Sequence, residues 1–305
     1  MLTRRQKHIL LKFFSLFSVV RGYNILVVVI AQYLASVYIF AYDKPVGEVV
    51  FDINLLALVL SSSATIAAGY IINNFYDSEK DLINRPQKTM LDRLVSQNTK
   101  LSFYFVLNFV ALVCASYVSF KAVLFFALYI FAIWFYSHRL KKLPIVGNLV
   151  SSVLTITPFF AIFIYYKNFE TVVFAQALFL FMLVSMRELT KDLENIKGDL
   201  ALGYNTVPVV YGERVSKIML LVVGALTIIL ALLITLYFEI GLMYYFFYIS
   251  IILLLINCSL IWKAKSKKQY LIIHNIFKFI IVAGVFSIVL IDLDILLNRF
   301  SWITH

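Results

Sequence analysis

Residues 53–88 read INLLALVLSSSATIAAGYIINNFYDSEKDLINRPQK, an apolar run that passes directly into a polar one. Residues 53–74 are long and apolar enough to cross a bilayer as a helix, which takes about 20 residues. Asn73, Asp77 and Asp81 follow one another at intervals of four, so a helix that continues carries all three on one face. Stacked oxygen side chains repel unless a cation lies among them, and Mg²⁺ prefers oxygen ligands. The stretch therefore predicts a membrane-spanning helix that ends in a divalent-cation site.

Eight further apolar runs of spanning length lie outside this stretch. Hydrophobic residues make up 62% of the 305 residues and charged residues 14%, whereas a soluble chain carries about 25% charge. This composition excludes a soluble globular protein, and the helix-length runs exclude an outer-membrane β-barrel. We expect an all-α integral membrane protein that forms a single domain over residues 1–305. Its nine spans are expected at residues 22–42, 53–74, 101–119, 121–137, 146–166, 170–187, 216–238, 241–262 and 271–297.

The net charge of +11 is explained by the membrane topology that the basic residues predict. Most of the 27 Lys and Arg residues fall at the N-terminus and in alternate connections between spans, as they do on the cytoplasmic side. The pattern predicts an N-in, C-out protein of the cell membrane and removes the argument for nucleic-acid binding. The basic start lacks a cleavage pattern of small residues, so we expect residues 1–20 to form an interfacial helix and not a signal peptide.

A second acidic stretch lies four spans further along, where residues 187–212 read RELTKDLENIKGDLALGYNTVPVVYG. Glu188, Asp192, Asn195 and Asp199 are spaced by four, three and four residues, which places them on one helical stripe about 60° wide. A solvated helix end with mixed charges would explain a single stripe, but acidic residues near a bilayer are costly and usually functional. The two stripes predict two helices that face each other across a cavity, with Mg²⁺ and a bridging diphosphate between them.

Both acidic stretches resemble motifs of a known family. NNFYDSEKD (residues 73–81), followed by NRP (84–86), resembles the first aspartate-rich motif of the UbiA superfamily of intramembrane prenyltransferases. KDLENIKGD (191–199) resembles the second motif. The resemblance covers essentially the whole chain and implies nine helices around a central cavity, with cytoplasmic cap loops after the second and sixth helices.

Three shorter segments resemble one branch of that superfamily. YSHRLKK (residues 136–142) with GN (147–148), and RE (187–188) ahead of the second motif, most resemble the digeranylgeranylglyceryl phosphate synthase branch. The resemblance implies Mg²⁺-dependent transfer of a polyprenyl group from a geranylgeranyl-like diphosphate to a lipophilic acceptor.

The resemblance also implies a role for individual residues. The catalytic residues that it implies are Asp77, Asp81, Asp192 and Asp199. The metal ligands would be Asn73, Asp77, Asp81, Asp192, Asn195 and Asp199. The substrate-binding residues would be Arg21, Asn24, Arg85, Lys88, Tyr136, Lys141 and Lys191.

The chain departs from the family pattern at three places. Asn74 stands where the family often has Asp, and Asn195 stands where the second motif usually has its first Asp. Each keeps an acceptor oxygen and loses a charge, so we expect a lower affinity for Mg²⁺. Residues 21–24 lack the proline that is common after the arginine, but Arg21 and Asn24 match, and their spacing lets both face the cavity. We still expect an active enzyme.

The acceptor and the class of function leave alternatives open. The branch implies the hydroxyl of a prenylglycerol phosphate, which gives an ether lipid; the alternative is an electron-rich ring, as in quinone biosynthesis. A transporter of an anionic lipid or metabolite also fits charged span ends, but the carboxylates lie at one surface and Gly and Pro number only 10 and 5. We expect an enzyme with two lipophilic substrates in a membrane, and no protein or nucleic-acid partner.

Overall fold

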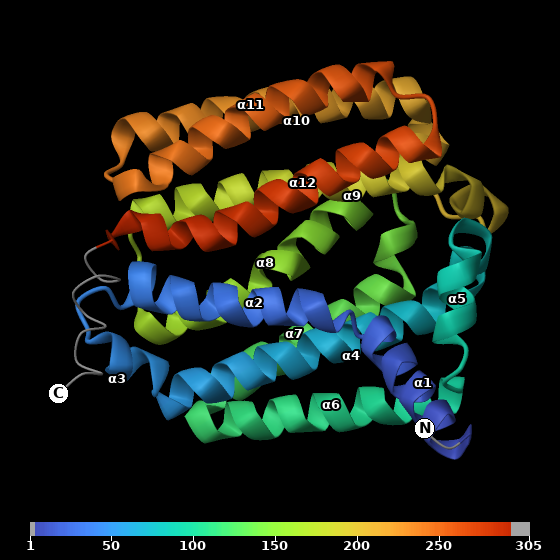
Figure 1. The fold of residues 1–305 in the computed structure, drawn as a ribbon, viewed down its shortest axis with the longest axis horizontal. Coiled ribbons are helices and arrows are strands. Elements are labelled where there is room, and N and C mark those ends of the chain that lie inside the picture. Colours follow the sequence, from blue (N-terminus) through green and yellow to red (C-terminus); the bar gives the residue numbers. More distant parts are fainter. Residues whose placement is uncertain (1–3, 294–305) are drawn as a thin grey trace.

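The computed structural model describes residues 4–293, and its regular elements in that range are all helical (Figure 1). The chain order is α1 (Arg4–Val19), α2 (Gly22–Ala35), η1 (Ser36–Phe40), α3 (Val46–Val50), α4 (Ile53–Asn84), α5 (Pro86–Asp92), α6 (Gln97–Val118) and α7 (Phe120–His138). It continues with η2 (Leu140–Lys142), α8 (Val146–Tyr166), α9 (Thr171–Ala201), α10 (Val207–Tyr237), η3 (Gly241–Met243), α11 (Tyr244–Lys263), α12 (Lys267–Ser287) and η4 (Ile288–Ile291).

Nine of the helical segments within residues 4–293 are long and apolar enough to cross a membrane, which confirms the predicted number and order. They are Gly22–Phe40, Ile53–Asn84, Gln97–Val118, Phe120–His138, Val146–Tyr166, Thr171–Ala201, Val207–Tyr237, Gly241–Lys263 and Lys267–Ile291. The last predicted span, 271–297, ends in residues that lie outside the described part of the chain. The prediction of a single domain over residues 1–305 stays a prediction.

Two of the spans are much longer than predicted. α4 has 32 residues and α9 has 31, so each is about 47 Å long at 1.5 Å per residue, against about 30 Å of bilayer hydrocarbon. α4 ends at Asn84, because Pro86 disfavours helix in Arg85, the residue that precedes it. α9 ends just before Gly203, whose φ of +65° suits a glycine at a helix end. Most of the acidic residues expected in the cap loops therefore continue these helices, and the cap loops themselves stay a prediction.

α4 is the most buried of the spans: 67% of its most apolar 18-residue stretch is buried inside the protein. Its small side chains allow close helix packing. Ser61 donates a hydrogen bond to the Ala111 carbonyl of α6 at 3.0 Å, and a Cβ at Gly69 would lie 3.0 Å from Ile133 of α7. One hydrophobic cluster joins α2, α4, α7 and α8, and a second joins α9 through α12. α8 of the first group packs against α9 of the second (Figure 1), and α4 also packs against α9. The polar ends of α4 and α9 lie at the same end of the bundle, where they line one cavity.

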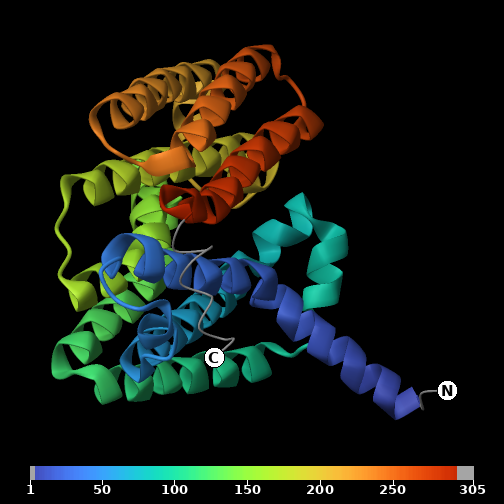
Figure 2. The ribbon, with the colours of Figure 1, turned by 60° about the vertical axis from the view of Figure 1, so that its left-hand side comes forward.

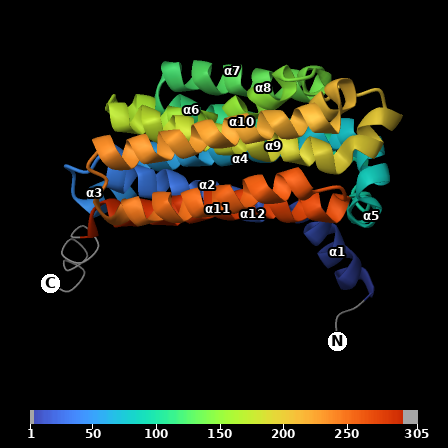
Figure 3. The same ribbon diagram turned by 90° about the horizontal axis from the view of Figure 1, so that it is seen from above.

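α1 projects from the bundle at an angle to α2 (Figures 2 and 3). Arg21 turns the chain between them with a left-handed φ of 50°. Ser15 donates to the Leu91 carbonyl at 2.8 Å, and Ser18 donates to Asp92 at 3.2 Å, so α1 is fixed to α5. Leu10, Leu11, Phe14 and Phe17 are exposed, as an interfacial helix requires. The interfacial position and the N-in orientation stay predictions.

Candidate active site

A cavity of about 220 Å³ lies between the polar ends of α4 and α9. Both predicted stripes contribute to its wall, together with residues from η2, α7 and α8. Six basic side chains line it: Arg21, Lys80, Arg85, Lys141, Arg187 and Lys191. Four acidic side chains line it: Asp77, Asp81, Glu188 and Asp192. The excess of positive charge suits an anionic ligand.

On the α4 wall, the predicted Asn73, Asp77 and Asp81 all line the cavity. Lys141 of η2 donates to Asp77 at 2.7 Å and to the Asn73 side-chain oxygen at 3.4 Å. The structure therefore brings the predicted lysine directly onto the first motif. Burial lowers the pKa of Lys141, while the Asp77 carboxylate opposes that shift.

On the α9 wall, the predicted Asp192 and Asn195 line the cavity with Glu188 and Lys191. Asp192 accepts a hydrogen bond from the neutral amide of Asn148 at 2.8 Å. Lys191 pairs with Glu188 at 2.9 Å and is therefore held on the same wall. The Asn195 amide donates to the Lys191 carbonyl at 2.8 Å, and its side-chain oxygen is buried without a hydrogen-bond partner within the described part of the chain. That oxygen is available to a ligand.

Asp199 belongs to the predicted stripe, but it is absent from the cavity wall and has no exposed surface. Its carboxylate lies 3.2 Å from Lys80 and accepts a hydrogen bond from Thr206 at 3.2 Å. The segment after α9 folds back over it, since the Tyr204 N–H donates to the Asp199 carbonyl at 2.9 Å. In this structure, Asp199 holds Lys80, and Lys80 lines the cavity 3.9 Å from Asp77.

Tyr204 was absent from the predicted site. Its side chain is 4% exposed, and its hydroxyl donates to Asp77 at 3.2 Å. The Lys80 Nζ lies 4.5 Å from the centre of its ring, and Lys141 and Lys142 lie at 6.0 and 5.1 Å, within the range of cation–π attraction. Burial and the Asp77 charge raise the pKa of Tyr204, so its hydroxyl stays a donor. No motif in the sequence marks this residue.

Three further residues of the cavity were also outside the predicted set. Lys80 lies three positions after Asp77 and shares its helix face, which the spacing alone could have indicated. Arg187 and Asn148 occur in the segments used for the family resemblance, but neither was assigned a role there. Their positions show that both walls carry polar groups beyond the acidic stripes.

Arg85, Lys88 and Asn74 lie further from the cavity centre. Arg85 lines the cavity and pairs with Glu194 of α9 at 3.1 Å. Lys88 does not line the cavity, and it lies 3.9 Å from Asp92. Asn74 accepts from the buried Lys100 at 2.9 Å and donates to Asp92 at 3.2 Å. Asn74 therefore faces α5 and α6, and its replacement of Asp removes no charge from the cavity.

Arg21 and Asn24, the predicted substrate-binding residues nearest the N-terminus, lie beside α4. The Arg21 guanidinium carbon lies 5.0 Å from the centre of the Tyr70 ring, and Arg21 lines the cavity. Asn24 donates to the Tyr70 hydroxyl at 3.1 Å and does not line the cavity. Tyr136 lines the cavity from the end of α7, as predicted.

The oxygen donors of the two walls fit Mg²⁺ when a phosphate ligand completes the shell. Among the described residues, no three His, Cys, Asp or Glu side chains come together as a metal cage. Mg²⁺ usually takes one or two carboxylates and receives other oxygens from water and phosphate. Asp77 and Asp81 on one wall, Asp192 on the other, and the unpartnered Asn195 oxygen supply such a set.

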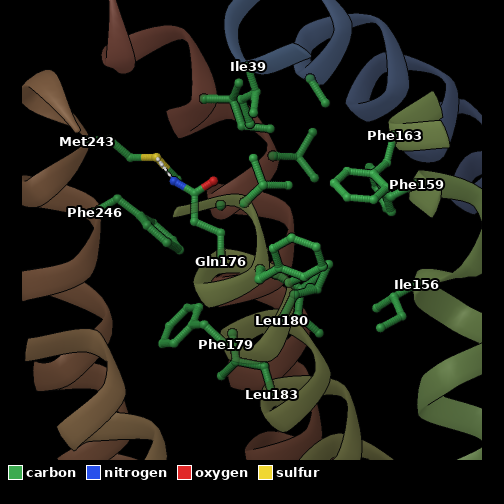
Figure 4. A pocket seen from close by; sticks show the side chains of 18 of the residues that line it. Ile39, Ile156, Phe159, Phe163, Gln176, Phe179, Leu180, Leu183, Met243 and Phe246 are labelled. Atoms are coloured by element: carbon green, nitrogen blue, oxygen red, sulfur yellow. Dashed lines mark hydrogen bonds between the residues drawn. The ribbon is translucent and has the colours of Figure 1, made fainter. Parts of the chain in front are cut away.

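An apolar pocket of about 140 Å³ lies between α2, α8, α9, α11 and α12 (Figure 4). Phenylalanine, leucine and isoleucine side chains dominate its wall. Gln176 is its polar member, and the Gln176 amide contacts the Met243 sulfur at 3.8 Å. Helices α8 and α9 contribute to the walls of both this pocket and the polar cavity.

Comparison with known proteins places this geometry in context. The model of the UbiA prenyltransferase family matches residues 28–280. A digeranylgeranylglyceryl phosphate synthase of Methanobrevibacter smithii is 28% identical over 210 residues, which cover 66% of this chain and 70% of the relative. The corresponding protein of Thermococcus gammatolerans is 32% identical over 176 residues, which cover 57% of this chain and 63% of the relative. The chain thus spans slightly less than two thirds of the second relative.

Solved structures give the same fold. A structure of a digeranylgeranylglyceryl phosphate synthase matches with a TM-score of 0.69 and 21% identity, over 92% of this chain and 98% of that chain. A UbiA homologue from Archaeoglobus fulgidus bound to GPP and Mg²⁺ matches with a TM-score of 0.67 and 16% identity, over 90% of this chain and 99% of that chain. The same homologue was also solved with DMAPP and Mg²⁺.

Proposed function

Because the chain belongs to the UbiA prenyltransferase family, we propose that it transfers a polyprenyl group from a polyprenyl diphosphate to the hydroxyl of a prenylglycerol phosphate. The proposal extends to this chain the activity named for its relatives from Methanobrevibacter smithii and Thermococcus gammatolerans. The observation that carries it is a cation-rich cavity, walled by oxygen donors on two helices, together with an apolar pocket that shares α8 and α9 with it. A prenyl diphosphate has the same two chemical parts.

The diphosphate would lie between α4 and α9. Asn73, Asp77 and Asp81 on α4, with Asp192 and Asn195 on α9, would hold Mg²⁺, which when bound neutralises charge on the leaving diphosphate. Lys141, Lys80, Lys191 and Arg85 are the basic side chains beside these acceptors. Their ammonium and guanidinium groups would bind the phosphate oxygens and stabilise the charge that develops as the C–O bond breaks.

The prenyl chain would lie in the apolar pocket. Glu188 in the polar cavity and Phe174 in the apolar pocket are both on α9, about 21 Å apart at 1.5 Å per residue. That distance suits a chain of several isoprene units. Phe159, Phe163 and Phe179 would cover the chain and exclude water, which would otherwise compete with the acceptor (Figure 4).

The reaction exchanges one C–O bond for another. The diphosphate leaves with the electrons of its bond to the first carbon of the prenyl chain, and the acceptor oxygen bonds to that carbon and loses its proton. Tyr136 and Tyr70 line the cavity and present aromatic faces that would stabilise a developing allylic cation. The chain would act in the cell membrane with the cavity open toward the cytoplasm, as the distribution of Lys and Arg predicts.

Product analysis tests the acceptor class. Membranes that contain the protein are incubated with labelled geranylgeranyl diphosphate and Mg²⁺, together with a prenylglycerol phosphate, a hydroxylated aromatic acid or neither. We expect a new ether lipid of the mass of both substrates less diphosphate. A product formed only with the aromatic compound would contradict the acceptor, and diphosphate release in no mixture would contradict prenyl transfer.

A further inference from the structure

Three basic side chains from three different segments gather beside the cavity, at the start of α2. They are Arg21 between α1 and α2, Lys88 on α5 and Lys278 on α12. The Lys278 Nζ lies 4.4 Å from the centre of the Tyr23 ring, two residues after Arg21. The Lys88 Nζ lies 3.9 Å from Asp92, which accepts a hydrogen bond at 3.2 Å from Ser18, three residues before Arg21. We call Arg21, Lys88 and Lys278 the α2 basic cluster.

Few acidic groups balance this cluster. Within the described part of the chain, no ion pair is found for Arg21 or Lys278. Lys88 has Asp92 at 3.9 Å, and Asp92 also accepts from Ser18 and Asn74. Partial burial and the Arg21 guanidinium together lower the pKa of Lys88. A bound anion would lower the repulsion between these partly buried like charges.

Two of the three cluster members lie outside the cavity proposed for the diphosphate. Lys88 and Lys278 do not line the polar cavity, whereas Arg21 does. Arg21 lies over Tyr70, which precedes Asp77 by seven residues on α4, a distance of about 10 Å along the helix. An anion held here would lie beside the reacting groups without occupying the proposed Mg²⁺ positions.

The surroundings of the cluster suit a lipid. α2 and α12 run side by side (Figure 1), and Lys278 lies eleven positions into the ninth span. Leu26 on α2 is 60% exposed, and Phe279, next to Lys278 on α12, is 61% exposed. Exposed apolar side chains on membrane-spanning helices would contact the apolar chains of the bilayer. A phosphate with an apolar chain attached would therefore find charge and apolar surface at one place.

We propose that Arg21, Lys88 and Lys278 bind the phosphate monoester of the lipid acceptor and so place its hydroxyl against the prenyl diphosphate. This inference rests on the proposed function, because it takes the acceptor to be a lipid with a phosphate group. In a glycerol phosphate the hydroxyl and the phosphate share a three-carbon backbone, so fixing the phosphate beside the cavity also fixes the hydroxyl.

Binding and kinetics of Lys278→Met test the site. The probe is a dialkylglycerol phosphate, which keeps the phosphate and has no free hydroxyl to react, with purified protein in uncharged detergent. We expect the variant to bind this probe about tenfold more weakly, as for the loss of one charge-assisted hydrogen bond, and to keep its KM for geranylgeranyl diphosphate. The matched control is Lys268→Met, ten positions earlier on α12 and exposed, which should change neither quantity.

Two outcomes with Lys278→Met would overturn the assignment: unchanged binding of the probe, or a rise in the KM for geranylgeranyl diphosphate as large as the loss of probe binding. Two outcomes with the wild type would also overturn it. They are failure to bind the probe, and competition by a phosphodiester lipid as strong as that of the probe, which would assign the cluster to bilayer lipid. An unchanged KM for geranylgeranyl diphosphate in the variant also shows that it is folded. Failure of the proposed function is recognised separately, because the wild type would then release diphosphate only with another acceptor class.

Discussion

The two acidic stripes have similar spacing in the sequence, four and four residues on α4 against four, three and four on α9, but different surroundings in the structure. On α4, Asp77 is contacted by a lysine and a tyrosine hydroxyl from other segments. On α9, Asp192 is contacted by the neutral Asn148 amide, and Asn195 keeps an unpartnered oxygen. Asp77 on α4 is therefore already compensated by positive charge, whereas Asp192 and Asn195 on α9 have no ion pair within the described part of the chain. The other two members of the α9 stripe, Glu188 and Asp199, pair with lysines. We infer that the two walls contribute differently to metal binding.

The largest expected effect is the loss of one carboxylate from either wall. Asp77→Ala and Asp192→Ala should each lower kcat by at least about 10²-fold, because each removes a charge that stabilises the leaving diphosphate. Initial rates at saturating Mg²⁺ measure this. The control is Glu239→Ala, which should keep the wild-type rate. Glu239 is exposed and follows the end of α10 that lies far from the cavity. Near-wild-type turnover of either aspartate variant would remove the two-walled metal site.

The second prediction separates Asp199 from Asp192. Asp199→Asn breaks a buried ion pair with Lys80, so it should destabilise the fold by about 3 kcal/mol, whereas Asp192→Asn should not. Thermal unfolding of the two variants in detergent gives the comparison. Equal stability of both, together with an equal shift in Mg²⁺ dependence, would place Asp199 in the metal site instead of behind Lys80.

The third prediction concerns the extra contact on the α4 wall. Tyr204→Phe removes the hydrogen bond to Asp77 and keeps the ring beneath the lysines, so activity should fall about fivefold, the effect of one hydrogen bond. Tyr204→Leu also removes the ring, so its activity should fall further. The measurement is the initial rate of both variants at several Mg²⁺ concentrations. Equal rates for the two would show that the ring contacts with Lys80, Lys141 and Lys142 contribute nothing.

The smallest effect is expected from one carboxylate added on the α9 wall. Asn195→Asp places a carboxylate among uncompensated oxygens, so it should lower the Mg²⁺ concentration for half-maximal rate a few-fold, the size of effect expected for one more charge near the surface. Asn74→Asp is the matched control, because Asn74 contacts Lys100 and Asp92 away from the cavity. It should leave the Mg²⁺ dependence unchanged. A shift in Asn74→Asp, or none in Asn195→Asp, would contradict the assigned directions of these side chains.

Much of the fold follows from the sequence, because spanning length and apolar composition are local properties. The number and order of the spans are confirmed, and the family recognised from residues 73–81 and 191–199 is confirmed by the match over residues 28–280. The lengths of α4 and α9 were underestimated, since polar residues ended the predicted spans although the helices continue to Asn84 and Ala201, shortly before Pro86 and Gly203.

The site was harder to predict, because it depends on contacts between distant segments. Spacing placed Asn73, Asp77, Asp81, Asp192 and Asn195 correctly on the cavity wall. It could not show that the chain after α9 folds back and covers Asp199. Tyr204 reaches Asp77 across 127 positions of sequence, a contact that no local pattern encodes. The roles of all these residues stay predictions until they are tested.

Diphosphate release by the purified protein tests the central claim most directly. The protein is mixed with geranylgeranyl diphosphate and a prenylglycerol phosphate, and released diphosphate is measured with Mg²⁺ and then with a chelator. We expect one diphosphate for each prenyl group transferred, with release abolished by the chelator and restored by added Mg²⁺. Release that is independent of Mg²⁺, or no release with any acceptor, would contradict Mg²⁺-dependent prenyl transfer.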